Sequence, residues 1–136
     1  RLKGGTGEAS VFGSEFKAPA SEAAFANCFA ASILDMDDGH DLGGHPGAPV
    51  VPAALATAEA TGASGKEFLE AVVVGYEISH RFARCWHRYQ HPVYQADGSW
   101  GSVACAAPCG SSGQASGYAL SVRWAMFTTA TNEAGW

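Results

Sequence analysis

Small side chains fill most of the helix-like segments of this chain, and no other feature constrains its fold as strongly. Residues 21–34 place alanine, serine and apolar residues at helical spacing, and residues 52–61 are rich in alanine. Helices with small contact residues can pack closely, because the separation of two helix axes depends on the side chains between them. The sequence shows no internal repeat and no alternation of strands with helices. It therefore predicts an all-α, compact helical domain with close packing.

Capping and breaking residues mark three helices. Ser21 is the expected N-cap of the first helix. Pro52 suits the first turn of a second helix, and Gly62 suits its end. In Ser64-Gly65-Lys66-Glu67 the hydroxyl and the carboxylate can each accept a backbone N–H, which is a capping box that opens a third helix to about Trp86. One face of that helix carries Leu69, Val72, Val73, Tyr76 and His80.

The two ends of the chain are less regular. Residues 1–18 are rich in glycine and serine and are predicted to form a loop or a hairpin. Residues 88–98 form a break rich in histidine, proline and glycine, after which 101–107 resume a small-residue helix. Residues 108–136 form a divergent tail, in which the segment 116–124 fits either a helix or a buried strand.

Composition excludes several classes of protein. The 136 residues, 47% apolar and 15% charged, are typical of one globular domain that spans residues 1–136. A net charge of −5 with only eight lysines and arginines argues against binding to nucleic acid, and no apolar run is long enough for a membrane span. The four cysteines have no C-x-x-C spacing, and no secretory leader is visible, so a cytoplasmic location is expected.

Chemistry is expected in the segment 34–47. It holds four carboxylates and two imidazoles between Asp35 and His45, in a chain otherwise poor in charge. A carboxylate beside a histidine can orient the ring and fix its tautomer, which suits proton transfer near neutral pH. The aspartates could also suggest calcium, but Gly39 stands where a ligand is needed and no distal glutamate follows, so no metal is expected.

Other patterns are weaker candidates. The glycines of the segment 4–10 lack the preceding strand and the Gly-Lys-Ser/Thr of a phosphate-binding loop. His87 and His91 have a spacing that zinc sites use, but three arginines at the same helix end would repel a cation. A solvated basic helix end or a carboxylate-binding patch explains these arginines better: Arg81, Arg84 and Arg88. No pattern supports a nucleophilic cysteine.

Sequence blocks between about Gly5 and Ala107 follow one another in a recognisable order. They are Ala23–Asn27, Leu34–Asp38, His45–Gly47, Val51–Ala56, Ala58-Glu59, Gly62–Gly65 and Gly75–Glu77. Together they resemble the MmgE/PrpD family, which includes 2-methylcitrate dehydratase, cis-aconitate decarboxylase and iminodisuccinate epimerase. The resemblance implies a large helical domain with a smaller lid domain, usually dimeric, that acts on small polycarboxylates without metal or organic cofactor.

The resemblance also implies roles for individual residues. By position, Asp35 matches the acidic residue of the family's L-D-x-D-D block, and His45 matches the active-site histidine of H-P-x-G. His91 is the closest match to a second family histidine, with His87 the next. The residues expected to bind substrate are Asp38, Gly39, His40 and Arg84. Arg84 is chosen because the negative charge of the substrate needs a positive partner, and Arg88 is the alternative.

Members of this family are several times longer, so the chain resembles a fragment of the helical domain without the lid or the site lysines. Its exposed faces are expected to associate with another copy. The predicted function is a lyase in which one histidine removes a proton beside a carboxylate and a second group assists the leaving group. Asp35 would hold His45, and His91 would be the partner acid. The alternative is an inactive fragment that acts as a self-associating interaction module.

Overall fold

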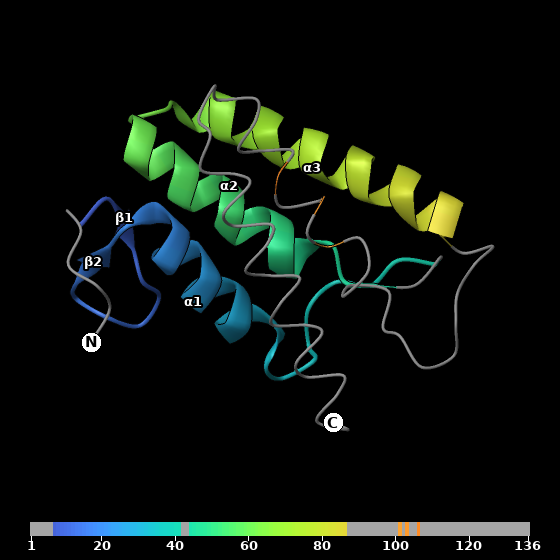
Figure 1. Ribbon diagram of the computed structural model, residues 1–136, viewed down its shortest axis with the longest axis horizontal. Helices are drawn as coiled ribbons and strands as arrows, with labels where there is room; N and C mark the ends of the chain where they lie inside the picture. Colours follow the sequence, from blue (N-terminus) through green and yellow to red (C-terminus); the bar gives the residue numbers. More distant parts are fainter. Residues whose placement is uncertain (1–6, 42–43, 87–100, 102, 104–105, 107–136) are drawn as a thin grey trace.

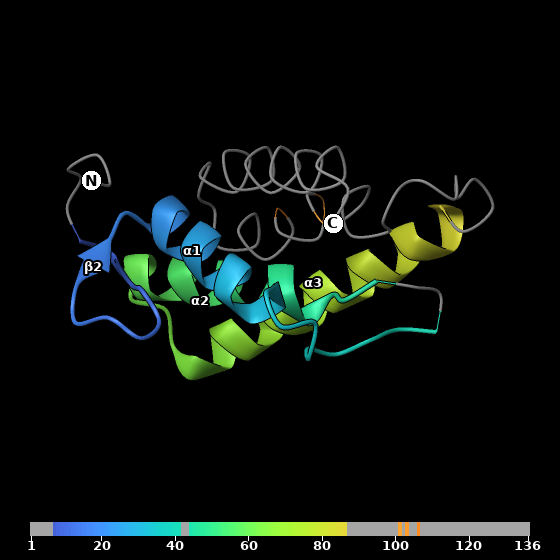
Figure 2. The ribbon, with the colours of Figure 1, turned by 90° about the horizontal axis from the view of Figure 1, so that it is seen from below.

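The computed structural model describes residues 7–41, 44–86, 101, 103 and 106. Within them the chain forms, in order, β1 (Ala9–Ser10), β2 (Lys17–Ala18), α1 (Ala20–Ser32), α2 (Gly47–Thr61) and α3 (Gly65–Trp86). The helix α2 lies between α1 and α3, and the hairpin lies beside the start of α1 and the end of α2 (Figures 1 and 2). The described part is mostly helical, as the sequence predicts.

Small side chains make the contact between α1 and α2. Ala23 and Ala24 of α1 and Ala53 of α2 are completely buried. They belong to one core cluster with residues of the hairpin and of both helices: Ala9, Ala18, Ala20, Cys28 and Ala56. Because alanine adds only a methyl group, little more than backbone separates the two helices. This confirms the close packing that the composition predicts.

The face of α3 that contacts α2 is only partly the face that the apolar residues predict. Val72 and Tyr76 pack against a buried pair formed by Val50 of α2 and Ala83 of α3. Ser79 is buried on the same side and donates a hydrogen bond to the carbonyl of Gly75 at 2.7 Å. Small residues thus line the contact, whereas two larger residues of the predicted face are exposed, Leu69 by 62% and Val73 by 66%.

Two helices begin earlier than predicted. The helix α1 begins at Ala20, and the Ala20 N–H donates to the carboxylate of Glu8 at 3.2 Å, so the hairpin supplies the capping group in place of Ser21. The helix α2 begins at Gly47, which places Pro52 inside the helix. Proline inside a helix removes one backbone hydrogen bond, and this single loss does not stop the helix here.

The turn between α2 and α3 is as predicted. Gly62 ends α2 in the left-handed region at φ 67°. The Ser64 N–H donates to the Glu67 carboxylate at 2.7 Å, and the Glu67 N–H donates to the Ser64 hydroxyl oxygen at 3.3 Å. Two hydrogen bonds lower the pKa of Glu67. The bond from the Ser64 backbone N–H has the larger effect, and the bond from the Ser64 hydroxyl has the smaller one. The capping box is therefore confirmed.

The two ends of the chain differ in how much is described. Residues 9–18 form an antiparallel hairpin in which Ala9 pairs with Ala18 and Ser10 with Lys17. The predicted break at 88–98 and the tail at 108–136 lie outside the described residues, and of the predicted helix at 101–107 only residues 101, 103 and 106 are described. Among the described residues, no helix is long and apolar enough to cross a bilayer.

Candidate functional site

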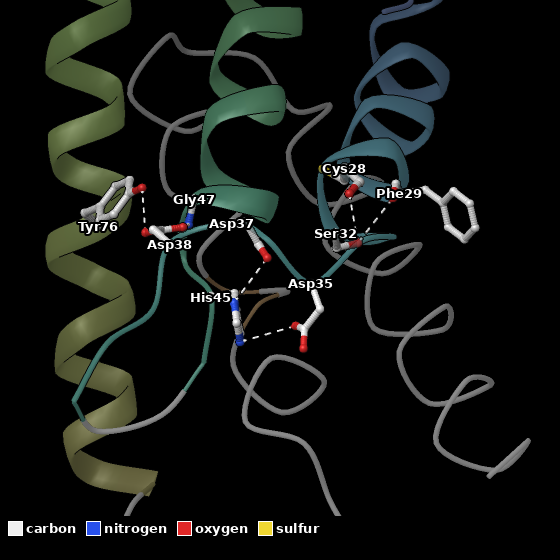
Figure 3. A network of polar contacts seen from close by, with 9 residues as sticks. All are labelled: Cys28, Phe29, Ser32, Asp35, Asp37, Asp38, His45, Gly47 and Tyr76. Atoms are coloured by element: carbon white, nitrogen blue, oxygen red, sulfur yellow. Dashed lines mark hydrogen bonds and ion pairs between the residues drawn. The ribbon is translucent and has the colours of Figure 1, made fainter. Parts of the chain in front are cut away.

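The loop between α1 and α2 folds the Asp-His segment back on itself. The Asp35 N–H donates to the carbonyl of Ser32 at 3.1 Å, just past the end of α1. Asp35 has φ 51°, a left-handed conformation that aspartate tolerates better than most residues. Further along, the His40 N–H donates to the carbonyl of Gly44 at 3.2 Å. These turns bring His45 back beside Asp35 (Figure 3).

The imidazole of His45 lies between two carboxylates (Figure 3). Its Nδ1 is 3.2 Å from Oδ1 of Asp37, and its Nε2 is 3.7 Å from Oδ1 of Asp35. The exposed fractions of the side chains are 35% for His45, 12% for Asp37 and 87% for Asp35. Each ring nitrogen thus faces a different carboxylate, one enclosed by protein and one in solvent.

Asp37 is not among the site residues that the sequence predicts. Both of its carboxylate oxygens are enclosed, and neither accepts a hydrogen bond from a described residue. The His45 ring lies beside it, with Nδ1 3.2 Å from Oδ1 of Asp37. The sequence points to Asp37 only weakly. This residue lies two positions after Asp35 in an irregular segment, where spacing alone does not decide which side chain is buried.

Asp38 ties the loop to two helices (Figure 3). Its Oδ1 accepts the N–H of Gly47, the first residue of α2, at 2.9 Å, and a carboxylate is favoured at a helix N-terminus. Its Oδ2 accepts the hydroxyl of Tyr76 on α3 at 2.9 Å. A Cβ at position 47 would press on the Asp38 carboxylate and lie 2.7 Å from the Tyr76 hydroxyl, so glycine is required by close approach.

The hydroxyl of Tyr76 is a hydrogen-bond donor in this arrangement. Burial raises its pKa to about 12, together with the hydrogen bond to Asp38 and the negative charges of Asp38 and Asp37. Tyr76 therefore keeps its proton at neutral pH and donates a hydrogen bond to Oδ2 of Asp38.

Two histidines join the loop to α3 at a second point. The ring of His40 stacks on His80, with centroids 4.0 Å apart and planes at 25°. Tyr76 meets His80 edge-on at 5.9 Å. The pKa of His80 is lowered mainly by burial and, to a smaller extent, by the nearby charge of His40. Beside this stack Gly39 faces open space, since a Cβ built there would contact nothing within 4 Å.

The remaining predicted site residues lie on α3 or outside the described residues. Arg84 is exposed in the last turn of α3. His91 and the alternative His87 lie outside the described residues. The structure thus gathers Asp35 and His45 at one point of the loop, and places Asp38 and His40 against α3.

Asp35, Asp37 and His45 could also hold a metal ion. One ligand atom from each side chain lies within 4.8 Å of the others. Carboxylate oxygens with an imidazole nitrogen are ligands that suit divalent transition metals. No metal is expected from the sequence, so this donor set is a feature that the structure adds.

The sequence of this chain was compared with known protein families, curated proteins and solved structures. The chain matches the family model described as the MmgE/PrpD N-terminal domain, over residues 1–132. It belongs to the MmgE/PrpD family. No curated protein and no solved structure matches the chain. The match confirms the resemblance and the helical fold class that follow from the sequence, and the MmgE/PrpD family includes lyases and dehydratases.

Proposed function

We propose that this MmgE/PrpD domain takes part in lyase chemistry on small polycarboxylates, of the 2-methylcitrate dehydratase type, with His45 as the base. The observation that supports this most directly is the His45 ring, which two carboxylates flank while about a third of the side chain stays open to solvent. A histidine that carboxylates orient and that a solute can reach is suited to general base catalysis.

In the proposed reaction, His45 takes the proton from a carbon beside a substrate carboxylate. The electrons of the broken C–H bond form a carbon–carbon double bond, and the neighbouring C–O bond breaks. The departing hydroxide takes a proton from a second group and leaves as water. His91 is the proposed donor of that proton.

Substrate binding in this proposal needs positive charge, because the loop itself is acidic. Arg84, exposed at the end of α3, is the proposed partner of a substrate carboxylate. The open space at Gly39 would let a small acid lie against the loop without displacing a side chain. Asp38 and His40, both in contact with α3, would form the wall beside it.

The test is turnover of small acids in deuterated water. The purified chain is incubated with 2-methylcitrate or cis-aconitate, and NMR follows product formation and deuterium uptake. His45→Gln should abolish both signals, since glutamine cannot take up the proton. Lys66→Gln, at an exposed position near the start of α3, is the control and should leave the rate unchanged. Unchanged turnover in His45→Gln, or a folded protein that converts no acid, contradicts the proposal.

A second candidate function is self-association without catalysis. Large apolar side chains are exposed just after α1, Leu34 by 73% and Met36 by 84%, and others are exposed along α3. Exposed large apolar side chains are common where proteins associate. Light scattering over a range of concentrations tests it: a dimer that Leu34→Ser together with Met36→Ser dissociates supports this candidate, and a monomer at every concentration contradicts it.

A further inference from the structure

We propose that Asp35, Asp37 and His45 form a binding site for one divalent transition-metal ion, of which Zn²⁺ is the representative case. The site goes beyond the proposed function, since the family resemblance implies catalysis without a metal. One carboxylate oxygen from each aspartate and one ring nitrogen of the histidine lie within 4.8 Å of one another, so three ligand atoms can converge on a single ion.

The contact between the His45 ring and Asp37 has the dimensions of a coordination sphere. Zinc binds a histidine nitrogen at about 2.0–2.1 Å and a carboxylate oxygen at about 2.0–2.2 Å, which places neighbouring ligand atoms of one ion roughly 3.0–3.4 Å apart. Nδ1 of His45 lies 3.2 Å from Oδ1 of Asp37. These two atoms therefore already have the spacing of two ligands. The side chain of Asp35 is 87% exposed and can rotate toward the same point.

The enclosed oxygens of Asp37 supply an electrostatic reason for a bound cation. No described residue donates a hydrogen bond to either oxygen, and no lysine or arginine among the described residues forms an ion pair with Asp35 or Asp37. An enclosed carboxylate is costly unless it is hydrogen-bonded, paired or bound to a metal. Two carboxylates and a neutral ring carry two negative charges, which one divalent ion balances.

The neighbouring side chains of the loop have other contacts, which limits the site to three protein ligands. Asp38 uses one oxygen for the N–H of Gly47 and the other for the hydroxyl of Tyr76. The ring of His40 stacks on His80. An imidazole ligand favours ions such as Zn²⁺, Cu²⁺ and Ni²⁺, whereas Mg²⁺ and Ca²⁺ prefer oxygen ligands alone. The donor set therefore predicts weaker binding of Mg²⁺ than of Zn²⁺.

A metal ion at this site would block the proposed base. A neutral imidazole has one nitrogen lone pair available, and the bound ion occupies it, so the ring of His45 could no longer take up a substrate proton. We therefore expect the ion to inhibit turnover. This consequence rests on the proposed function, whereas the metal site itself does not.

Calorimetric titration with ZnCl₂ tests the site, on protein treated with EDTA and then freed of it. The native site should bind one ion. Asp37→Asn should weaken this binding by about 100-fold or more, since loss of an outer-shell partner of a metal ligand already costs about 10–100-fold. Asp41→Asn is the matched control, because it removes an exposed carboxylate of the same loop that lies outside the donor set. Every chain carries Cys85→Ser, so that this exposed thiol does not bind zinc.

A second measurement needs no variant in the loop. Paramagnetic Mn²⁺, added below one ion per chain, should broaden the amide NMR signals of Asp35, Asp37 and His45 first. The signals of the hairpin, at the opposite end of α1 (Figure 1), should stay sharp. Absence of Zn²⁺ binding, equal affinity in a folded Asp37→Asn protein, or broadening centred elsewhere overturns the inference. So does Mg²⁺ binding as tight as that of Zn²⁺, which would indicate only a diffuse acidic surface.

The two proposals can fail separately. Where the chain turns over an acid, free Zn²⁺ at a concentration that saturates the site should lower the rate, and EDTA should restore it. A chain that binds Zn²⁺ through Asp37 but converts no acid contradicts the proposed function and supports the metal site. Unchanged turnover with the site saturated contradicts the role of His45 as the base, and leaves the metal site supported by the binding data.

Discussion

At the scale of single residues, Asp38 shows how one side chain can fix a loop. Its two oxygens accept from Gly47 and from Tyr76, which lie on different helices. Such double use suits a residue that positions its neighbours, and it leaves the carboxylates of Asp35 and Asp37 to the histidine.

The bond between Tyr76 and Asp38 should be measurable by a double-mutant cycle. Tyr76→Phe removes the hydroxyl and should lower the free energy of unfolding by about 1 kcal/mol, the usual net value of such a bond. Asp38→Ala should cost more, because the Gly47 N–H also loses its acceptor. In urea unfolding, the double variant should lose less than the sum of the single variants. Strict additivity would show that the hydroxyl and the carboxylate do not interact.

Two glycines of the loop should respond differently to alanine. At Gly47 the added methyl would displace the Asp38 carboxylate and the Tyr76 hydroxyl, so Gly47→Ala should lower the free energy of unfolding by about 1–2 kcal/mol. Gly39→Ala is the control, since its methyl meets open space. Thermal unfolding compares the two variants. A more stable Gly47→Ala protein, as helix propensity alone would give, would contradict the close approach.

The sequence predicts the pair of Asp35 and His45, and it misses Asp37. A match by position finds Asp35, because that residue is the first acidic residue of the L-D-x-D-D block. The backbone turns at Asp35 with a φ of 51°, and four aspartates in one short segment leave open which of them makes such a turn and which is enclosed. The proximity of Asp35 to His45 could thus be inferred from the sequence, but the burial of Asp37 could not.

At the scale of the elements, helix ends that depend on neighbouring residues are predicted well. Features that depend on residues far away in the sequence are not. Gly62 and the Ser64–Glu67 box act within a few residues, and both are confirmed. The start of α1 is missed because its cap comes from Glu8, which lies twelve positions away. The contact face of α3 is predicted only in part. Val72 and Tyr76 pack toward α2, but the buried residue of α3 at this contact is the small Ala83.

The capping box gives a prediction for α3. Ser64→Ala removes the acceptor of the Glu67 N–H and should lower the free energy of unfolding by about 1 kcal/mol, typical of an N-cap. Ser64→Thr is the matched control, since threonine keeps the hydroxyl. Both are compared by urea unfolding. Equal losses in the two variants would show that the hydroxyl does not cap the helix.

At the scale of the whole molecule, the loop and α3 are held together by groups that titrate. The lowered pKa of His80 means that the folded chain binds fewer protons than the unfolded one, although Glu77 and Asp38 act in the opposite direction. This contribution to stability is present at neutral pH. It is lost as the pH falls below the ordinary histidine pKa of about 6.5.

The prediction is a pH dependence that follows His80. His80→Phe keeps an aromatic ring for His40 to stack on but removes the titrating group. Its Tm should therefore fall less than that of the native chain between about pH 7 and pH 5. Glu70→Gln, an exposed position on the same helix, serves as the control. Parallel decreases of Tm in the native chain and in His80→Phe would contradict the role of His80.

The class of fold and the family could be inferred from the whole sequence, whereas the relation between loop and helices could not. Small-residue periodicity and ordered blocks extend over many positions, so single errors do not change the conclusion. The stacking of His40 on His80 joins positions forty apart, and no pattern in the sequence pairs them.

The arrangement of the three helices also bears on how quickly the loop takes shape. Each helix packs on the one next to it in the chain (Figure 1), and native contacts that are local in sequence favour rapid folding. Asp35 and His45 are ten positions apart, and a segment of that length closes in about 10–100 ns. Closure of this short loop is therefore not expected to slow the docking of α1 on α2.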